Sequence, residues 1–134
     1  LQLAIAAIMR HSHAGLAIAS FPLSSADGDL LPQVWSFRIG INFAHRVMAL
    51  VLTAFLIWFA VKLWRDSGVG KGLRIVTGGM LVMLGGQIAL GASVIWMLRN
   101  PYVTTGHVLL GACLLATTFG ITLWLHCRSK TNPS

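Results

Sequence analysis

Three long apolar runs constrain the fold of this chain more than any other feature. They cover residues 39–64, 75–98 and 102–125, and each exceeds the roughly 20 residues that a helix needs to cross a bilayer. Only 10% of the residues are charged, against roughly 25% in soluble domains. Because lipid offers no hydrogen-bond partners, the backbone of such runs is satisfied within helices. The sequence therefore predicts an all-α integral membrane protein.

A shorter apolar segment, residues 1–9, opens the chain. Its nine residues would cover about 13 Å as a helix, well short of a hydrocarbon core of roughly 30 Å. We interpret it as part of a truncated helix, and the chain as a fragment of a longer protein. Residues 11–37 are too polar to span a bilayer and are expected to form a structured external loop. The prediction is one transmembrane four-helix bundle over residues 1–134.

The lysines and arginines divide unevenly between the two ends of these helices. Six lie at the end formed by the connection around residues 62–74 and the C-terminal tail, and four lie at the other end. The acidic residues Asp27 and Asp29 lie in the 11–37 loop. The positive-inside rule therefore predicts a cytoplasmic C-terminus and an external loop. The same rule accounts for the net charge of +7. The basic residues therefore indicate the lipid bilayer as a partner, and no nucleic acid is predicted.

Two of the five histidines lie inside predicted membrane helices. His45 is six residues after Ile39 and His107 is six residues after Pro101, so both lie about 9 Å from the same membrane face. Ionisable groups at such positions are rare and usually functional. We interpret the pair as the two ligands of a haem iron, with hydrogen bonding between helices as the alternative. Zinc is disfavoured because a third or fourth ligand is not evident.

The neighbours of these histidines favour haem. Small residues, Ala49 and Gly111, follow the histidines by four positions and leave room for a flat macrocycle on the same helix face. Asn42 precedes His45 by one helical turn. Arg46 supplies a cation near the external interface, where haem propionates would need one, although an arginine there can also extend to the lipid headgroups.

The other histidines carry weaker signals. His11 and His13 lie in the external loop beside Arg10, where a ligand contact and a solvated position both remain open. His126 lies among basic residues at a helix end and is interpreted as solvated. Cys113 and Cys127 are expected at different depths, so a disulfide is not predicted.

Several motifs, in order along the chain, resemble those of the haem A synthase family. "RHSHAGLAIASFPL" (10–23) resembles its external-loop motif, and "INFAHR" (41–46) resembles the ligand helix of its C-terminal half. "GGQIALGASVIWMLRNPYVTTGHVLLGACLLAT" (85–117) resembles its last helix pair. The resemblance implies a protein of eight helices in two similar halves related by a pseudo-twofold axis. This chain would be the C-terminal half.

The resemblance also implies a function. Members oxidise a methyl group of haem O, their substrate, to the formyl group of haem A, and they lie in the bacterial or mitochondrial inner membrane. The implied cofactor is a b-type haem, its iron held by His45 and His107. The implied partners are the N-terminal half or a second four-helix unit, haem O synthase and oxidase assembly proteins. The residues expected to contact the cofactor are His45, His107, Arg46, Asn42, Arg10 and His11.

The chain departs from the family pattern in two places. Many bacterial members have a cysteine pair in an external loop, and residues 11–37 contain no cysteine. The family's N-terminal half has a glutamate three residues before a ligand histidine, where this chain has Asn42, and no acid lies in any predicted helix. We therefore predict no catalytic residue and assign this half to cofactor binding. The alternatives are a haem-binding electron-transfer subunit without chemistry of its own, and a purely structural membrane subunit.

Overall fold

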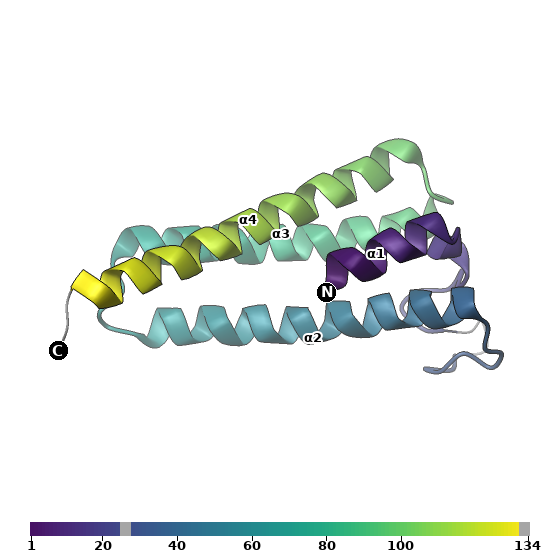
Figure 1. The fold of residues 1–134 in the computed structure, drawn as a ribbon, viewed down its shortest axis with the longest axis horizontal. Helices are drawn as coiled ribbons and strands as arrows, with labels where there is room; N and C mark the ends of the chain where they lie inside the picture. Colours follow the sequence, from purple (N-terminus) through teal and green to yellow (C-terminus); the bar gives the residue numbers. More distant parts are fainter. Residues whose placement is uncertain (25–27, 132–134) are drawn as a thin grey trace.

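A computed structural model describes residues 1–24 and 28–131 of the chain, and these contain helices and irregular loops but no strand. The elements are α1 (Gln2–His11), the 3₁₀ turn η1 (Ala14–Leu16), α2 (Phe37–Arg65), α3 (Lys71–Trp96) and α4 (Pro101–Thr131) (Figure 1). Helices α2, α3 and α4 are long and apolar enough to cross a membrane, with mean hydropathies of 2.2, 1.7 and 2.0. The prediction of an all-helical fold with helices of membrane-spanning length is confirmed for the described residues. Asp27, placed in the external loop above, lies outside the described residues.

Local signals in the sequence explain where α2 and α4 begin. The Ser36 side chain accepts a hydrogen bond from the Ile39 backbone amide at 3.3 Å and caps α2. Pro101 occupies the first position of α4, as its sequence context predicts. Asn100 Oδ1 accepts a hydrogen bond from the Tyr102 amide at 3.0 Å and caps the same turn.

The helix ends differ from the predicted apolar runs. Helix α2 begins at Phe37, two residues before the expected start at 39. Helix α3 begins at Lys71, four residues before the expected start at 75, because Asp66 Oδ1 accepts a hydrogen bond from the Gly68 amide at 2.8 Å and turns the chain early. Helix α4 continues past 125 to Thr131, through a stretch without glycine or proline. The other end of α3 stops at 96, two residues early, because Leu98 and Arg99 take left-handed backbone angles, φ 49° and 62°.

The helices pack in a simple order. Helices α3 and α4 run antiparallel and contact each other extensively, α1 lies along α2, and α2 contacts α3 (Figure 1). In the same view, α4 and α2 diverge from the end that carries the C-terminus toward the α3–α4 connection. The N-terminal end of α1 lies midway along α2.

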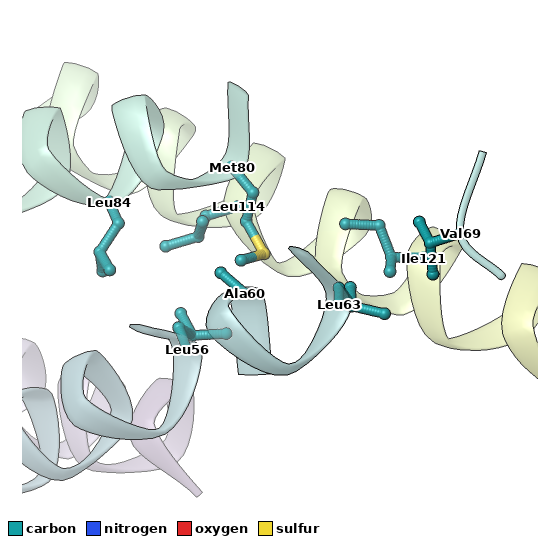
Figure 2. Close-up of a cluster of buried hydrophobic side chains, with 8 residues drawn as sticks. All are labelled: Leu56, Ala60, Leu63, Val69, Met80, Leu84, Leu114 and Ile121. Carbon is teal, nitrogen blue, oxygen red and sulfur yellow. The ribbon is translucent and has the colours of Figure 1, made fainter. Parts of the chain in front are cut away.

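The apolar core lies in the half of the molecule near the α2–α3 connection. Figure 2 shows its side chains meeting from α2, α3 and α4, with Met80 between Ala60 and Leu114. Met80 and Ala60 are fully buried. The complete cluster is Leu56, Ala60, Leu63, Val69, Met80, Leu84, Leu114 and Ile121. In lipid these contacts hold helices together by close packing rather than by removal from water.

The opposite end is covered by the chain that follows α1. The 3₁₀ turn η1 contacts both α1 and α2. Ala14 is fully buried and Ile18 is 4% exposed, although the segment has little regular structure. The described chain thus has an apolar end and an end closed by an irregular segment, and Asn42, which is buried, belongs to the second.

Candidate functional site

Two histidine–glutamine pairs lie in the half closed by η1. His45 on α2 meets Gln2 on α1, and His107 on α4 meets Gln87 on α3. Each pair therefore joins two helices that are adjacent in the chain and packed together. Both imidazoles are half-buried. Each of the two histidines selected from their predicted membrane depth therefore contacts a glutamine amide in the structure.

Gln2 holds His45 through two contacts. Its amide nitrogen lies 3.1 Å from His45 Nδ1 and donates a hydrogen bond to the His45 backbone oxygen, also at 3.1 Å. The other ring nitrogen of His45, Nε2, has no hydrogen-bond partner among the described residues. One side of the imidazole is therefore fixed by α1.

His107 shows the same division between its two ring nitrogens. Its Nε2 lies 3.4 Å from the Gln87 amide nitrogen, while Nδ1 is buried and has no hydrogen-bond partner. The ring lies against Gly91, where a Cβ would come 3.2 Å from His107 Cε1. Gly111, which the sequence assigned to the space beside a macrocycle, instead faces the Gln87 amide.

Arg46 is directed at the backbone of residues 14–23, the covering segment that follows α1 and closes this end of the helices. Its guanidinium donates hydrogen bonds to the carbonyl oxygens of Ser20 at 2.8 Å, Ile18 at 2.8 Å and Leu23 at 3.4 Å. The same group lies over the Phe21 ring, 6.0 Å from its centroid. A planar fork with five donors suits this arrangement. The residue next to His45 thus fastens the covering segment to α2.

Asn42 fastens the same segment one turn earlier. Its side chain is 4% exposed, and its amide nitrogen donates to the backbone oxygens of Ala14 at 2.8 Å and Gly15 at 3.3 Å. Both bonds are donations, which an asparagine can make and a carboxylate cannot. Asn42 therefore acts here as an anchor for η1.

Substitution of Asn42 should separate anchoring from acid chemistry. We expect Asn42→Ala to destabilise the covering segment by about 1–3 kcal/mol, because two backbone oxygens lose their donor. Asn42→Asp should be worse, since a carboxylate would face two carbonyl oxygens. Limited proteolysis of residues 13–24 measures the effect, with Ser67→Ala, exposed in the α2–α3 connection, as control. An Asn42→Asp protein that resists proteolysis as well as the parent would contradict the anchoring role.

His45 and His107 lie on separate helices, α2 and α4. No group of three or more His, Cys, Asp or Glu residues able to hold a bare metal ion occurs in the described part of the chain. Two imidazoles suit a haem iron, because the porphyrin supplies its other four ligands. The assignment of His45 and His107 as a pair of iron ligands stays a prediction.

Comparison with known proteins assigns the chain to a family. The family model described as cytochrome oxidase assembly protein, COX15-CtaA, matches residues 1–119. The chain belongs to this family.

Three of its relatives carry the name haem A synthase. The one from Shouchella clausii is 34% identical over 130 residues, which is 92% of this chain and 40% of the relative. The one from Geobacillus thermodenitrificans is 28% identical over 131 residues, 96% of this chain and 39% of the relative. The one from Staphylococcus epidermidis strain RP62A is 26% identical over 115 residues, 84% and 36%. The chain thus spans about two fifths of their length. No solved structure matches it significantly.

Two of the residues expected to contact the cofactor lie apart from the histidine pairs. Arg10 and His11 are exposed at the end of α1, and their side chains make no hydrogen bond within the described residues. His13 is also exposed, in the left-handed conformation that ends the α1 turn. His126 is exposed near the far end of α4. The contact of Arg10 and His11 with a cofactor stays a prediction from the family resemblance.

Sequence reasoning missed Gln2 and Arg99. Gln2 stands near the start of the chain, yet Gln2 and Ala6 repeat the spacing of Gln87 and Gly91, a glutamine followed by a small residue four positions later. That repeat was the available signal. Arg99 comes from the α3–α4 connection and lies against η1, where a Cβ on Gly15 would come 3.4 Å from Arg99 Nε. No motif marked this contact.

Proposed function

We propose that this chain is the C-terminal four-helix half of a haem A synthase and holds one b-type haem between His45 and His107. The observation that carries the proposal is the placement of two half-buried imidazoles, on α2 and α4, in the half closed by η1. Each has one nitrogen beside a glutamine amide and one without a partner among the described residues. Family membership and the names of the relatives support haem A chemistry for the complete protein.

The residues of the chain would divide the work of the site. His45 and His107 hold the iron, and the haem, when bound, supplies one-electron redox chemistry. Asn42 and Arg46 hold the segment around η1 over this end of the helices through five hydrogen bonds to its backbone. A covered site keeps water away from the cofactor. Arg46, Arg10 and His11 remain candidates for contact with the propionates.

The catalytic oxidation of haem O is assigned to the rest of the enzyme. Oxidation of a methyl group requires a group that accepts protons or stabilises a developing cation, and a carboxylate suits that role. The three acids of this chain are Asp27, Asp29 and Asp66. Asp29 and Asp66 lie outside the helices, and Asp27 lies outside the described residues. Asn42 occupies the position where a glutamate would be expected, and it does not titrate. This half therefore serves as the cofactor half.

The lack of acidic residues in the described helices also favours a second candidate, a haem-binding electron-transfer subunit. The absorption spectrum of the full-length protein purified from membranes tests haem binding for both candidates, and a six-coordinate low-spin haem is the expected result. Conversion of haem O to haem A separates the candidates. A protein without haem would leave the histidines as interhelical hydrogen-bonding groups.

The environment proposed for the chain is the inner membrane of a bacterium or a mitochondrion, with the C-terminus in the cytoplasm or its mitochondrial equivalent. Lipid and the remaining helices of the enzyme would cover the exposed faces of α2 and α4. Haem O synthase and oxidase assembly proteins are proposed as further partners.

Thiol labelling tests this orientation. Six of the ten basic residues lie at the α2–α3 end, so Ser67 should face the cytoplasm and Leu31 the outside. Both are exposed. In a background without Cys113 and Cys127, an impermeant reagent added to intact cells should label Leu31→Cys and leave Ser67→Cys unlabelled. The reverse pattern would invert the topology.

A further inference from the structure

Helices α3 and α4 leave an apolar groove between them near the α2–α3 connection. Its volume is about 400 Å³. Ile121 is 2% exposed and belongs to the core cluster, so it forms the floor of the groove, whereas Val76 and Trp124 line it as exposed side chains. In a membrane such a groove opens toward the lipid acyl chains. The full lining is Gly72, Leu73, Val76, Gly120, Ile121 and Trp124.

Two glycines keep this groove open, one on each helix. Glycines in membrane helices usually let a neighbouring helix approach, as Gly86 does where a Cβ would come 3.1 Å from Leu110. A Cβ at Gly72 or Gly120 would instead meet no atom of the described residues within 4 Å. These two glycines therefore serve no close contact between the helices, and they leave a space that side chains do not fill.

Positive charges lie at one end of the groove. Helix α3 begins and α4 ends at this end of the molecule (Figure 1). The Arg128 guanidinium lies over the Trp124 ring, 5.4 Å from its centroid, and Trp124 lines the groove. Lys71 is exposed and directly precedes Gly72 at the start of α3. Each of the two helices thus places a basic residue at the same end of the groove.

Aromatic rings place this end of the helices at the membrane boundary. Trp58 on α2 and Trp124 on α4 each hold a basic residue four positions later, Lys62 at 6.0 Å and Arg128 at 5.4 Å from the ring centroid. Tryptophan concentrates at the level of the lipid headgroups, and long basic side chains extend toward that level. The cations therefore lie beside the headgroups, and the groove lies on the acyl-chain side of them.

We propose that this groove binds one anionic phospholipid, with an acyl chain along Gly72 and Gly120 and the phosphate beside Lys71 and Arg128. Charge complementarity selects the anionic class, because this end of the chain carries six basic residues and a single acid, Asp66. Basic pockets between transmembrane helices bind anionic headgroups in the same way. The site is independent of the proposed haem, which would lie toward the other end of the helices.

Lipid retention by the purified full-length protein tests the role of charge. Mixed with equal amounts of phosphatidylglycerol and phosphatidylcholine in detergent, the parent should retain one phosphatidylglycerol in native mass spectrometry. Each basic residue at a membrane surface strengthens the attraction of anionic lipid roughly fivefold, so Lys71→Gln and Arg128→Gln should each weaken retention by about that factor. Arg65→Gln is the control, because Arg65 is exposed at the same end but lies on α2, which does not line the groove.

A change inside the groove tests the role of shape. Gly120→Leu fills the space proposed for the acyl chain and leaves both basic residues in place, so the protein should lose the retained phosphatidylglycerol. Gly79→Leu is the matched control, because Gly79 is exposed on α3, has equal room for a Cβ and lies outside the groove. It should retain the lipid as the parent does. The charge variants keep the test decisive if Gly120→Leu does not fold.

Four results would overturn the lipid site. The parent may retain both lipids equally, which would remove the selection for charge, or neither, which would indicate that another helix of the enzyme covers the groove. Arg65→Gln may weaken retention as much as Arg128→Gln, which would indicate a diffuse attraction to the surface. A folded Gly120→Leu protein may retain phosphatidylglycerol like the parent, which would place the lipid elsewhere. Displacement of the lipid by glycerol phosphate at equal concentration would likewise reduce the site to a headgroup or phosphate site.

Discussion

His45→Ala and His107→Ala are each expected to abolish the low-spin spectrum of the bound haem. Either change removes one of two proposed axial bonds, so the iron becomes high-spin or the haem dissociates. Changes to groups that only support a metal ligand commonly weaken binding about 10–100-fold, so loss of the ligand should exceed about 100-fold. Haem content per protein and the absorption spectrum of the purified full-length protein measure this.

One control variant makes the result specific. His126→Ala should keep the parent spectrum, because His126 is exposed near the far end of α4. Retention of a low-spin haem in both His45→Ala and His107→Ala would reject the ligand assignment. The same variants are informative if the histidines only join helices. His107→Ala would then leave Gln87 without its contact and lower stability, with no haem signal to lose.

The main features of this fold were accessible from the sequence for a physical reason. Long apolar runs in lipid can form only helices, so α2, α3 and α4 follow from composition and from Pro101. The membrane depth of a histidine can be estimated from its distance to the start of its helix, at 1.5 Å per residue, where the helix starts at the membrane face. His45 and His107 could therefore be selected together without knowledge of tertiary contacts. In the structure His45 lies eight residues after the start of α2 at Phe37, two more than expected, and His107 lies six after the start of α4.

The contacts of the polar side chains were not accessible in the same way. Arg46 and Asn42 bond backbone oxygens around η1, and the path of that segment is set by tertiary contacts that no local pattern encodes. Gln2 reaches His45 across 43 positions of sequence. Periodicity identifies a face of a helix, but the partner on that face depends on how the neighbouring helix is placed. This explains why Arg46 was assigned to propionates from its position alone.

Arg46→Lys is expected to release the covering segment although it keeps the positive charge. Arg46 spans three carbonyl oxygens with one planar group, at 2.8, 2.8 and 3.4 Å. An ammonium group is compact and does not reach separated acceptors in this way. Hydrogen bonds to charged groups contribute about 1.5–3 kcal/mol each. Loss of the two short bonds should therefore lower the free energy of local opening by about 3 kcal/mol, and amide hydrogen exchange in residues 14–23 should become roughly 100-fold faster.

The lysine variant distinguishes the two roles proposed for Arg46. A propionate partner would require only a positive charge, whereas the three carbonyl oxygens require the planar guanidinium group. If Arg46 acts by holding the covering segment, Arg46→Lys and Arg46→Met should accelerate amide hydrogen exchange to a similar extent, and both should lose haem faster than the parent. Arg38→Met is the control, because Arg38 lies exposed in the first turn of the same helix. If Arg46→Lys exchanges like the parent while Arg46→Met does not, charge is the requirement. The contact of Arg46 with the covering segment would then be secondary to an anionic partner such as a haem propionate.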